Sequence, residues 1–99
     1  MEEVKKGGLE FHISEEIAQG KYCNLAIITH STSEFILDFA TVLPGIQKPQ
    51  VKSRIILTPE HAKRLLKSLQ DNITRYESAI GKIELPTPQP PQGMKIGEA

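Results

Sequence analysis

The fold is decided by one stretch of the sequence, Gln50-Val51-Lys52-Ser53-Arg54-Ile55-Ile56-Leu57-Thr58-Pro59-Glu60. Apolar and polar side chains alternate up to Leu57, which is the period of a half-buried strand. Thr58 then offers an N-cap hydroxyl, Pro59 suits the first helical position, and Glu60 places an acid near the positive end of the helix dipole. The sequence therefore predicts a strand over residues 50–57 that passes directly into a helix.

The predicted helix carries one apolar stripe. Its apolar residues recur at steps of three, one, three, four, three and four: Ala62, Leu65, Leu66, Leu69, Ile73, Tyr76 and Ile80. These steps follow the period of an α-helix, and Gly81 supplies a residue that ends it. We therefore expect a helix of about 24 residues whose apolar side packs on a sheet.

Three segments before residue 50 also have strand or hairpin character. Residues 9–13 alternate between apolar and polar side chains. Residues 22–30 and 34–43 are rich in β-branched and aromatic residues and flank a short polar connection, which favours a β-hairpin. Residues 14–20 hold either one helical turn or a wide loop. Together these elements predict an α+β fold, a four-stranded antiparallel meander followed by one long C-terminal helix.

Composition sets the limits of the domain. We expect a flexible N-terminus over residues 1–8, a single α+β domain over residues 9–83 and a proline-rich tail over residues 84–99. Four of the seven prolines lie within six positions of that tail, and proline lacks the amide donor that a helix or central strand needs. The run Pro88-Gln89-Pro90-Pro91 makes the tail either a ligand for an aromatic groove or a plain tail.

The charge balance and the single cysteine exclude several classes of protein. The 99 residues hold 12 Lys and Arg against 12 Asp and Glu, for a formal net charge of 0. That neutrality disfavours nucleic acid as a partner, and no apolar run approaches the roughly 20 residues that span a bilayer. Cys23 has no second cysteine to pair with, and residues 1–8 lack the features of a secretory signal. We expect a cytoplasmic protein without membrane association.

Strand alternation distributes the apolar side chains over two faces of the sheet. The face that we expect to seat the helix carries Leu25, Ile27, Phe35, Leu37, Phe39, Val51, Ile55 and Leu57. The opposite face mixes Ala26, Ile28, Ile36, Ala40, Val42 and Ile56 with Asn24, His30, Asp38, Lys52 and Arg54. A mixed surface of this kind is typical of an interface.

The lengths of the elements predict a homo-oligomer, either a dimer or a dimer of dimers. A helix of about 24 residues spans roughly 36 Å, whereas a strand of eight residues spans about 26 Å, so the helix overhangs its sheet. The candidate interface comprises Ile28, Ile36, Val42, Ile56, Tyr76 and Ile80. Alternatively, residues 9–17 or 83–85 fold back and cover these side chains.

No pattern of residues indicates a catalytic, cofactor or metal site. The three histidines are scattered, zinc-ligand spacing is absent, and the glycine pair at residues 7–8 precedes a strand rather than the helix that a phosphate loop requires. The best collection of polar groups is a candidate cluster of His30, Asp38, Lys52 and Arg54. Within it, Asp38 beside Lys52 or Arg54 would form a cross-strand ion pair.

Two runs of the sequence carry a resemblance to a known family. They are residues 17–39, which include Gly20-Lys21-Tyr22-Cys23-Asn24-Leu25 and Ser33-Glu34-Phe35-Ile36-Leu37-Asp38, and residues 51–65, which include Arg54-Ile55-Ile56-Leu57-Thr58-Pro59-Glu60-His61. The sequence resembles the bacterial domain of unknown function 3467 over roughly residues 10–80, which implies a soluble bacterial protein and no known reaction. A weaker likeness, of layout alone, is to the SecB-type secretion chaperones.

These observations favour a non-enzymatic module that binds protein or peptide or assembles with other copies. The alternative is a nucleic-acid-associated regulatory protein, supported by basic residues along the helix: Lys63, Arg64, Lys67 and Arg75. A third reading is a small enzyme with a polar site on the sheet. The absence of a triad, a metal set or a phosphate loop places the enzyme last.

Overall fold

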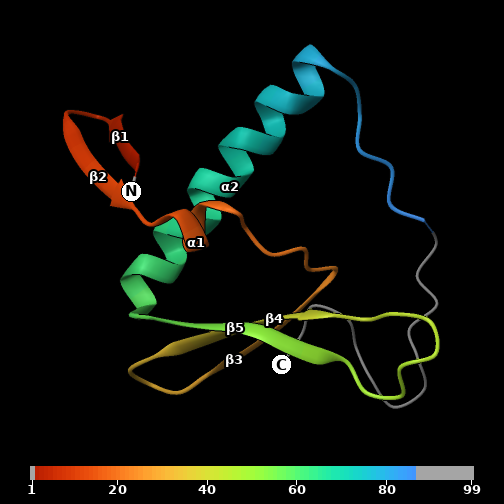
Figure 1. Ribbon diagram of the computed structural model, residues 1–99. Helices are drawn as coiled ribbons and strands as arrows, with labels where there is room; N and C mark the ends of the chain where they lie inside the picture. The colour runs from red at the N-terminus through yellow and green to blue at the C-terminus, as the bar shows by residue number, and fades with distance from the viewer. Residues whose placement is uncertain (1, 87–99) are drawn as a thin grey trace.

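The computed structural model describes residues 2–86 of the chain, with side chains from residue 7 onward. Five strands and two helices follow one another in the order β1 (Glu2–Lys6), β2 (Leu9–Ile13), α1 (Glu15–Ala18), β3 (Leu25–His30), β4 (Phe35–Thr41), β5 (Gln50–Leu57) and α2 (Pro59–Ala79) (Figure 1). The predicted α+β class, with antiparallel strands followed by a long C-terminal helix, is confirmed.

The strands form two separate antiparallel sheets. A three-stranded sheet has the order β3-β4-β5, and β1 pairs with β2 alone. Each predicted strand segment is a strand, but the segment at residues 9–13 pairs with Glu2–Lys6 and not with the sheet of the meander.

The N-terminal hairpin includes residues 2–6, within the segment that we expected to be flexible. Gly7 and Gly8 have φ angles of 55° and 83°, the left-handed values of a type I′ turn, whose twist matches that of paired strands. Lys6 therefore lies opposite Leu9 across a two-residue turn. The glycine pair between two strand-like segments is the sequence feature that could have predicted this hairpin.

The register of the β3-β4 hairpin differs from the one that we expected. The amide of Ser31 donates to the carbonyl of Glu34 over 2.9 Å, and this closed loop sets His30 opposite Phe35. Leu25 and Ile27 consequently lie opposite Ala40 and Asp38, away from the face that we had assigned to them. A shift of one residue between strands exchanges the two faces of a strand completely.

A bulge in β5 changes the face of Val51 in the same way. The register shifts between Phe39 and Ala40, so that Phe39 lies opposite Ser53 whereas Ala40 lies opposite Val51. Val51 therefore belongs with Ala40 and not with Ile55, because the extra residue of a bulge interrupts the alternation of side chains.

The buried core of the described residues is small and lies within the three-stranded sheet. Its apolar members are Leu25, Leu37 and Ala40. Thr41 is also buried, and its hydroxyl donates to the carbonyl of Tyr22 over 2.7 Å. Hydrogen bonding thus satisfies a polar group that burial would otherwise penalise.

Both helices begin at residues suited to the N-cap. The hydroxyl of Ser14 accepts a hydrogen bond from the amide of Ile17, so the segment that we left open is one helical turn followed by a loop. The hydroxyl of Thr58 accepts from the amide of His61 over 3.2 Å, and Pro59 opens α2 as predicted. The helix runs for 21 residues and ends at Ile80 and Gly81.

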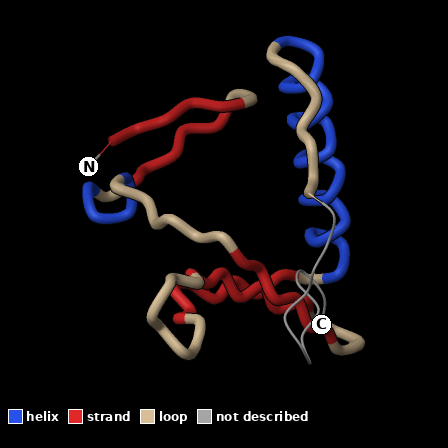
Figure 2. The backbone as a smooth tube through the Cα atoms, turned by 90° about the vertical axis from the view of Figure 1, so that its right-hand side faces the viewer, coloured by secondary structure: helices blue, strands red, loops and turns tan. Residues whose placement is uncertain are grey.

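Helix α2 does not lie on the sheet, which contradicts our expectation of a docked helix. Both views show it starting at the end of β5 and extending away from the three-stranded sheet (Figures 1 and 2). No residue of α2, all of which the structure describes, is buried, and Leu69 in the middle of the stripe is 55% exposed. The radius of gyration is 16.1 Å, whereas a compact chain of about 100 residues has about 13 Å.

The segments that we considered as covers leave the stripe open. The amide of Ile83 donates to a carboxylate oxygen of Glu77 over 2.9 Å, yet Ile80 remains 71% exposed and Leu85 is also exposed. Leu9 and Ile17 are exposed as well. The proline-rich run predicted at residues 84–99 lies, from residue 87 onward, outside the described residues.

Because the core is small, we expect Leu37 to contribute strongly to the stability of the fold. Leu37 is 6% exposed in the central strand, so Leu37→Ala should lower the free energy of unfolding by about 2 to 4 kcal/mol. Leu9→Ala, on the exposed N-terminal hairpin, is the matched control and should change it by less than about 1 kcal/mol. Urea titration followed by circular dichroism measures both, and equal losses would contradict this placement of the core.

Candidate functional site

The register collects a row of apolar side chains on one face of the three-stranded sheet. Directly opposed residues of antiparallel strands share a face, and the pairs Ile28 with Leu37 and Leu37 with Ile55 fix which face this is. We call it the cleft face, with the members Ala26, Ile28, His30, Phe35, Leu37, Phe39, Ile55 and Leu57. The register places the uncharged polar residues Thr41, Gln50 and Ser53 on the same face.

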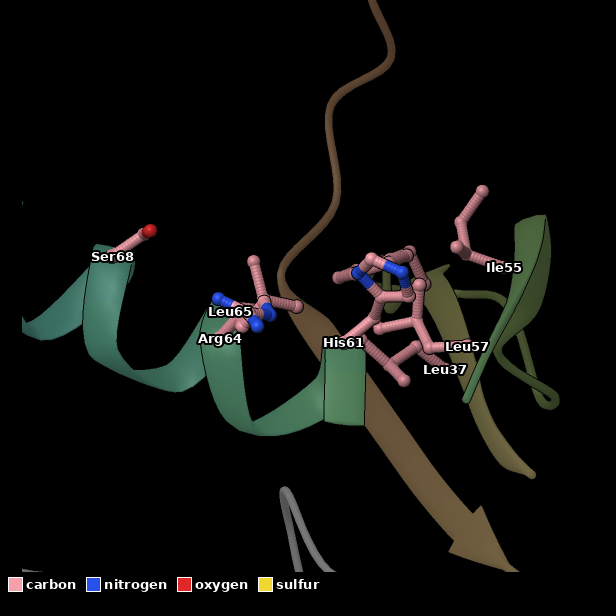
Figure 3. A pocket seen from close by; sticks show the side chains of 8 residues that line it. Leu37, Ile55, Leu57, His61, Arg64, Leu65 and Ser68 are labelled. Carbon is pink, nitrogen blue, oxygen red and sulfur yellow. The ribbon is translucent and has the colours of Figure 1, made fainter. Parts of the chain in front are cut away.

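An open cleft of about 480 Å³ forms where the cleft face meets the first turns of α2. Its lining residues are Leu37, Phe39, Ile55, Leu57, His61, Arg64, Leu65 and Ser68. Figure 3 shows Leu37, Leu57 and the ring of His61 gathered where the strand passes into the helix, with Leu65 one turn further along. The cleft exists because no loop separates the strand from the helix.

The cleft is continuous with the apolar stripe of α2. Leu65 lines the cleft and belongs to the stripe, which then continues through Leu69, Ile73 and Tyr76 along the exposed helix. Together the cleft and the stripe form one apolar surface, and we use that name for both below. An exposed apolar area of this extent marks a site of interaction.

One polar side chain at the cleft, that of Arg64, is engaged in a local interaction. The guanidinium of Arg64 donates from Nε and Nη2 to Oε2 of Glu60, over 3.1 and 2.8 Å, one helical turn away. On the cleft face, the ring of His30 stacks on Phe35 with centroids 5.3 Å apart. Within residues 2–86, no three His, Cys, Asp or Glu side chains gather in a group that could hold a metal ion.

The opposite face of the sheet holds the predicted cross-strand ion pair. Nε and Nη2 of Arg54 donate to the two carboxylate oxygens of Asp38 over 2.7 and 2.9 Å. The Asp38 side chain is only 12% exposed, whereas that of Arg54 is 62% exposed. These hydrogen bonds from Arg54 hold the pKa of Asp38 below its ordinary value of 3.8 and raise that of the guanidinium.

The structure separates the four members of the candidate polar cluster. Asp38 and Arg54 pair on one face, whereas His30 lies on the other. Lys52 lies at the bulge of β5, and its carbonyl accepts a hydrogen bond from Nζ of Lys21 over 3.0 Å. Because the pair and the imidazole lie on opposite sides of the sheet, they cannot act on one substrate together.

The candidate interface residues fall into three places. Ile28 lies on the cleft face, whereas Ile36 and Ile56 lie opposite one another on the other face. Val42 follows β4, where its amide and carbonyl are both hydrogen-bonded by the side chain of Asn24. Tyr76 and Ile80 lie at the far end of the α2 stripe.

The sequence analysis missed the cleft residues of the helix, above all His61, Arg64 and Ser68. A usable signal was present, because one residue between Leu57 and Pro59 leaves no room for a loop. The first helical turns must then lie next to the last residues of β5. We had instead assumed that the whole stripe returns across the sheet.

The comparison with family models covers almost all of the described chain. The model of the family described as a protein of unknown function, DUF3467, matches residues 1–85. The chain belongs to the DUF3467 family. Membership confirms the resemblance seen in the sequence, and it brings no reaction with it.

The other comparisons add no relative. No curated protein and no solved structure matches this DUF3467 chain significantly. The likeness of layout to the SecB-type chaperones therefore stays a prediction. Among the helices of residues 2–86, none is both long enough and apolar enough to cross a bilayer.

The lowered pKa of Asp38 predicts a specific loss of stability in acid. A carboxylate whose pKa is lower in the folded state stabilises the fold above its unfolded pKa, and this contribution disappears as the pH falls through the folded pKa. Asp38→Asn removes the titrating group. The variant should therefore be less stable than the wild type at about pH 6, and its stability should fall less on acidification.

Urea midpoints at about pH 6 and about pH 3 measure this difference. Asp71→Asn, which removes a carboxylate on the exposed helix, is the matched control for the loss of one charge. If Asp38→Asn loses as much stability as the wild type between the two pH values, the ion pair does not stabilise the fold.

Proposed function

We propose that this DUF3467 protein is a non-enzymatic protein- or peptide-binding and assembly module that acts through its apolar surface as a homo-oligomer, a dimer or a dimer of dimers. The observation that carries the proposal is the open cleft continuous with the exposed helix stripe. Apolar area removed from water contributes about 25 cal/mol per Å². Covering this surface would therefore stabilise the folded chain.

The composition of the surface suits a protein partner. Interface cores are apolar and favour aromatic residues and arginine, while charged groups lie at the rim. Phe39 and Tyr76 supply aromatic rings on the surface, and the Arg64 guanidinium borders the cleft. This pattern also fits an extended or helical peptide laid along the stripe.

The surface offers less support for the two other functions. For catalysis, Arg64 is held by Glu60 and Asp38 by Arg54, which leaves His61 and Ser68 as the other polar residues at the cleft. For nucleic acid, the basic residues of α2 are interspersed with the acids Glu60, Asp71 and Glu77, and the formal net charge of the chain is 0. Binding that releases counterions needs a basic patch without such neutralisation.

We also propose that the protein works in the bacterial cytoplasm. The free thiol of Cys23 supports this setting, since reducing compartments keep cysteines unpaired.

Photo-crosslinking tests the proposed function directly. A photoreactive phenylalanine analogue replaces Leu66 on the stripe or Ile55 in the cleft, in cells that express the full chain. Both positions should give adducts with protein that survive nuclease treatment. Asp71, on the opposite side of α2, is the matched control position and should give few.

Two results would overturn the proposal. One is equal labelling from Asp71 and from the two apolar positions, which would mean that the apolar surface has no preferred partner. The other is adducts that nuclease removes and that weaken steeply with salt, which would establish the nucleic-acid alternative.

A further inference from the structure

We propose that two copies of the chain pair through their α2 helices in antiparallel orientation, about a twofold axis at Asp71, so that the end of each helix closes the cleft of the other copy. The inference rests on the proposed function and specifies the partner of the apolar surface as a second copy of the chain. Four observations carry it: the period of the stripe, its symmetry, its charges and the area left exposed.

The stripe has the period of a coiled-coil seam. Six members of the stripe, all except Leu65, alternate steps of four and three: Ala62, Leu66, Leu69, Ile73, Tyr76 and Ile80. Two such steps sum to seven residues, the heptad repeat that keeps one seam facing one partner helix. Leu65 lies beside the seam and faces the cleft.

The seam is symmetric about Asp71 when two helices run in opposite directions. Leu69 and Ile73 lie two residues to either side of Asp71, so each meets the other on the partner. Leu66 and Tyr76 lie five residues away and pair in the same way. At each end the small Ala62 meets the partner's Ile80, so small and large side chains alternate as close packing requires.

The charges beside the seam select the antiparallel orientation. In that register Lys63 of one helix flanks the partner's Glu77, and the twofold axis repeats this pair at the other end. A parallel pair would instead set Lys63 beside Thr58 and Glu77 beside Asn72, with no opposite charges. Glu77 accepts the amide of Ile83 through Oε2, which leaves Oε1 for the lysine.

The stripe leaves large apolar side chains exposed along most of α2. Leu66 is 61% exposed, Leu69 55% and Tyr76 47%. A partner helix on this side would remove them from water together.

Antiparallel pairing also completes the cleft. Residue 80 of the partner lies level with Ala62, within one turn of the cleft residues His61 and Leu65. The partner's Tyr76 and Ile80 thus reach the open side of the apolar cleft, which a single chain leaves exposed. The cleft of each copy is incomplete without the other.

Cysteine mapping in the full chain tests the axis. In a Cys23→Ser background, Gln70→Cys should link to its own copy through a short bis-maleimide, because residue 70 lies next to the axis. Glu77→Cys is the matched control at the equivalent flanking position one heptad away. Its two copies would be about 18 Å apart along the helices, so it should not link to itself. It should link to Lys63→Cys when the two variants are mixed.

The outcomes separate the alternatives. Equal self-linking at residues 70 and 77 would mean parallel helices and would overturn the inference. A mass of 11.0 kDa by light scattering at high micromolar concentration, with no linking at residue 70, would also overturn it. In that case the homo-oligomer of the proposed function would fail as well, whereas photo-crosslinks from Leu66 to a different protein would still support its protein-binding part.

Substitutions give a second test that does not depend on crosslinking. Leu69→Asp should weaken dimerisation about 100-fold, because it buries a carboxylate at the centre of the seam, whereas Asp71→Lys on the outer side of the helix should not. Lys63→Glu should weaken dimerisation about fivefold. The double variant Lys63→Glu with Glu77→Lys, which exchanges the two charges, should restore dimerisation. If Leu69→Asp fails to fold, the charge exchange decides, and lack of restoration would contradict the antiparallel register.

Discussion

The junction between β5 and α2 is a single residue, Thr58, and the exposure of the apolar surface depends on it. Pro59 disfavours helical angles at the residue before it, and Thr58 accordingly has φ −68° and ψ 158°, while its hydroxyl caps the helix. With one extended residue between the strand and the helix, the first turns of α2 lie next to the last residues of β5. From there the helix leaves the sheet, and its stripe does not cover the cleft face (Figures 1 and 2).

This constraint ties the stability of the fold to association. The described chain buries few apolar side chains, all of them in the three-stranded sheet, and a domain of this size is only marginally stable even when its core is complete. Anything that binds the folded chain and not the unfolded one raises its stability. A partner on the apolar surface would therefore contribute to folding as well as to recognition, and the two processes would be difficult to separate.

The sequence was sufficient for the elements but not for their arrangement. The period change at Thr58 located β5 and α2 to within a residue or two, since a cap, a proline and a stripe all agree there. The faces of β3 could not be predicted, because they depend on how the Ser31–Glu34 loop closes, and alternation alone does not fix that register. Nor does an amphipathic helix say what covers its apolar side. We assumed its own sheet, and the structure leaves that side open.

The two faces of the sheet differ in a way that suits two successive associations. The cleft face is mostly apolar, and Lys52 lies at its bulge end, where it lines a hollow with Thr41. On the other face, the Asp38–Arg54 pair has the opposed residues Ile36 and Ile56 on one side and the bulge of β5 on the other. Arg54 is largely solvated there, and a partner that covered it would have to compensate its lost hydration. Closure of the cleft by a partner helix would therefore come first, and contact through the charged face would be the weaker step that separates a dimer from a dimer of dimers.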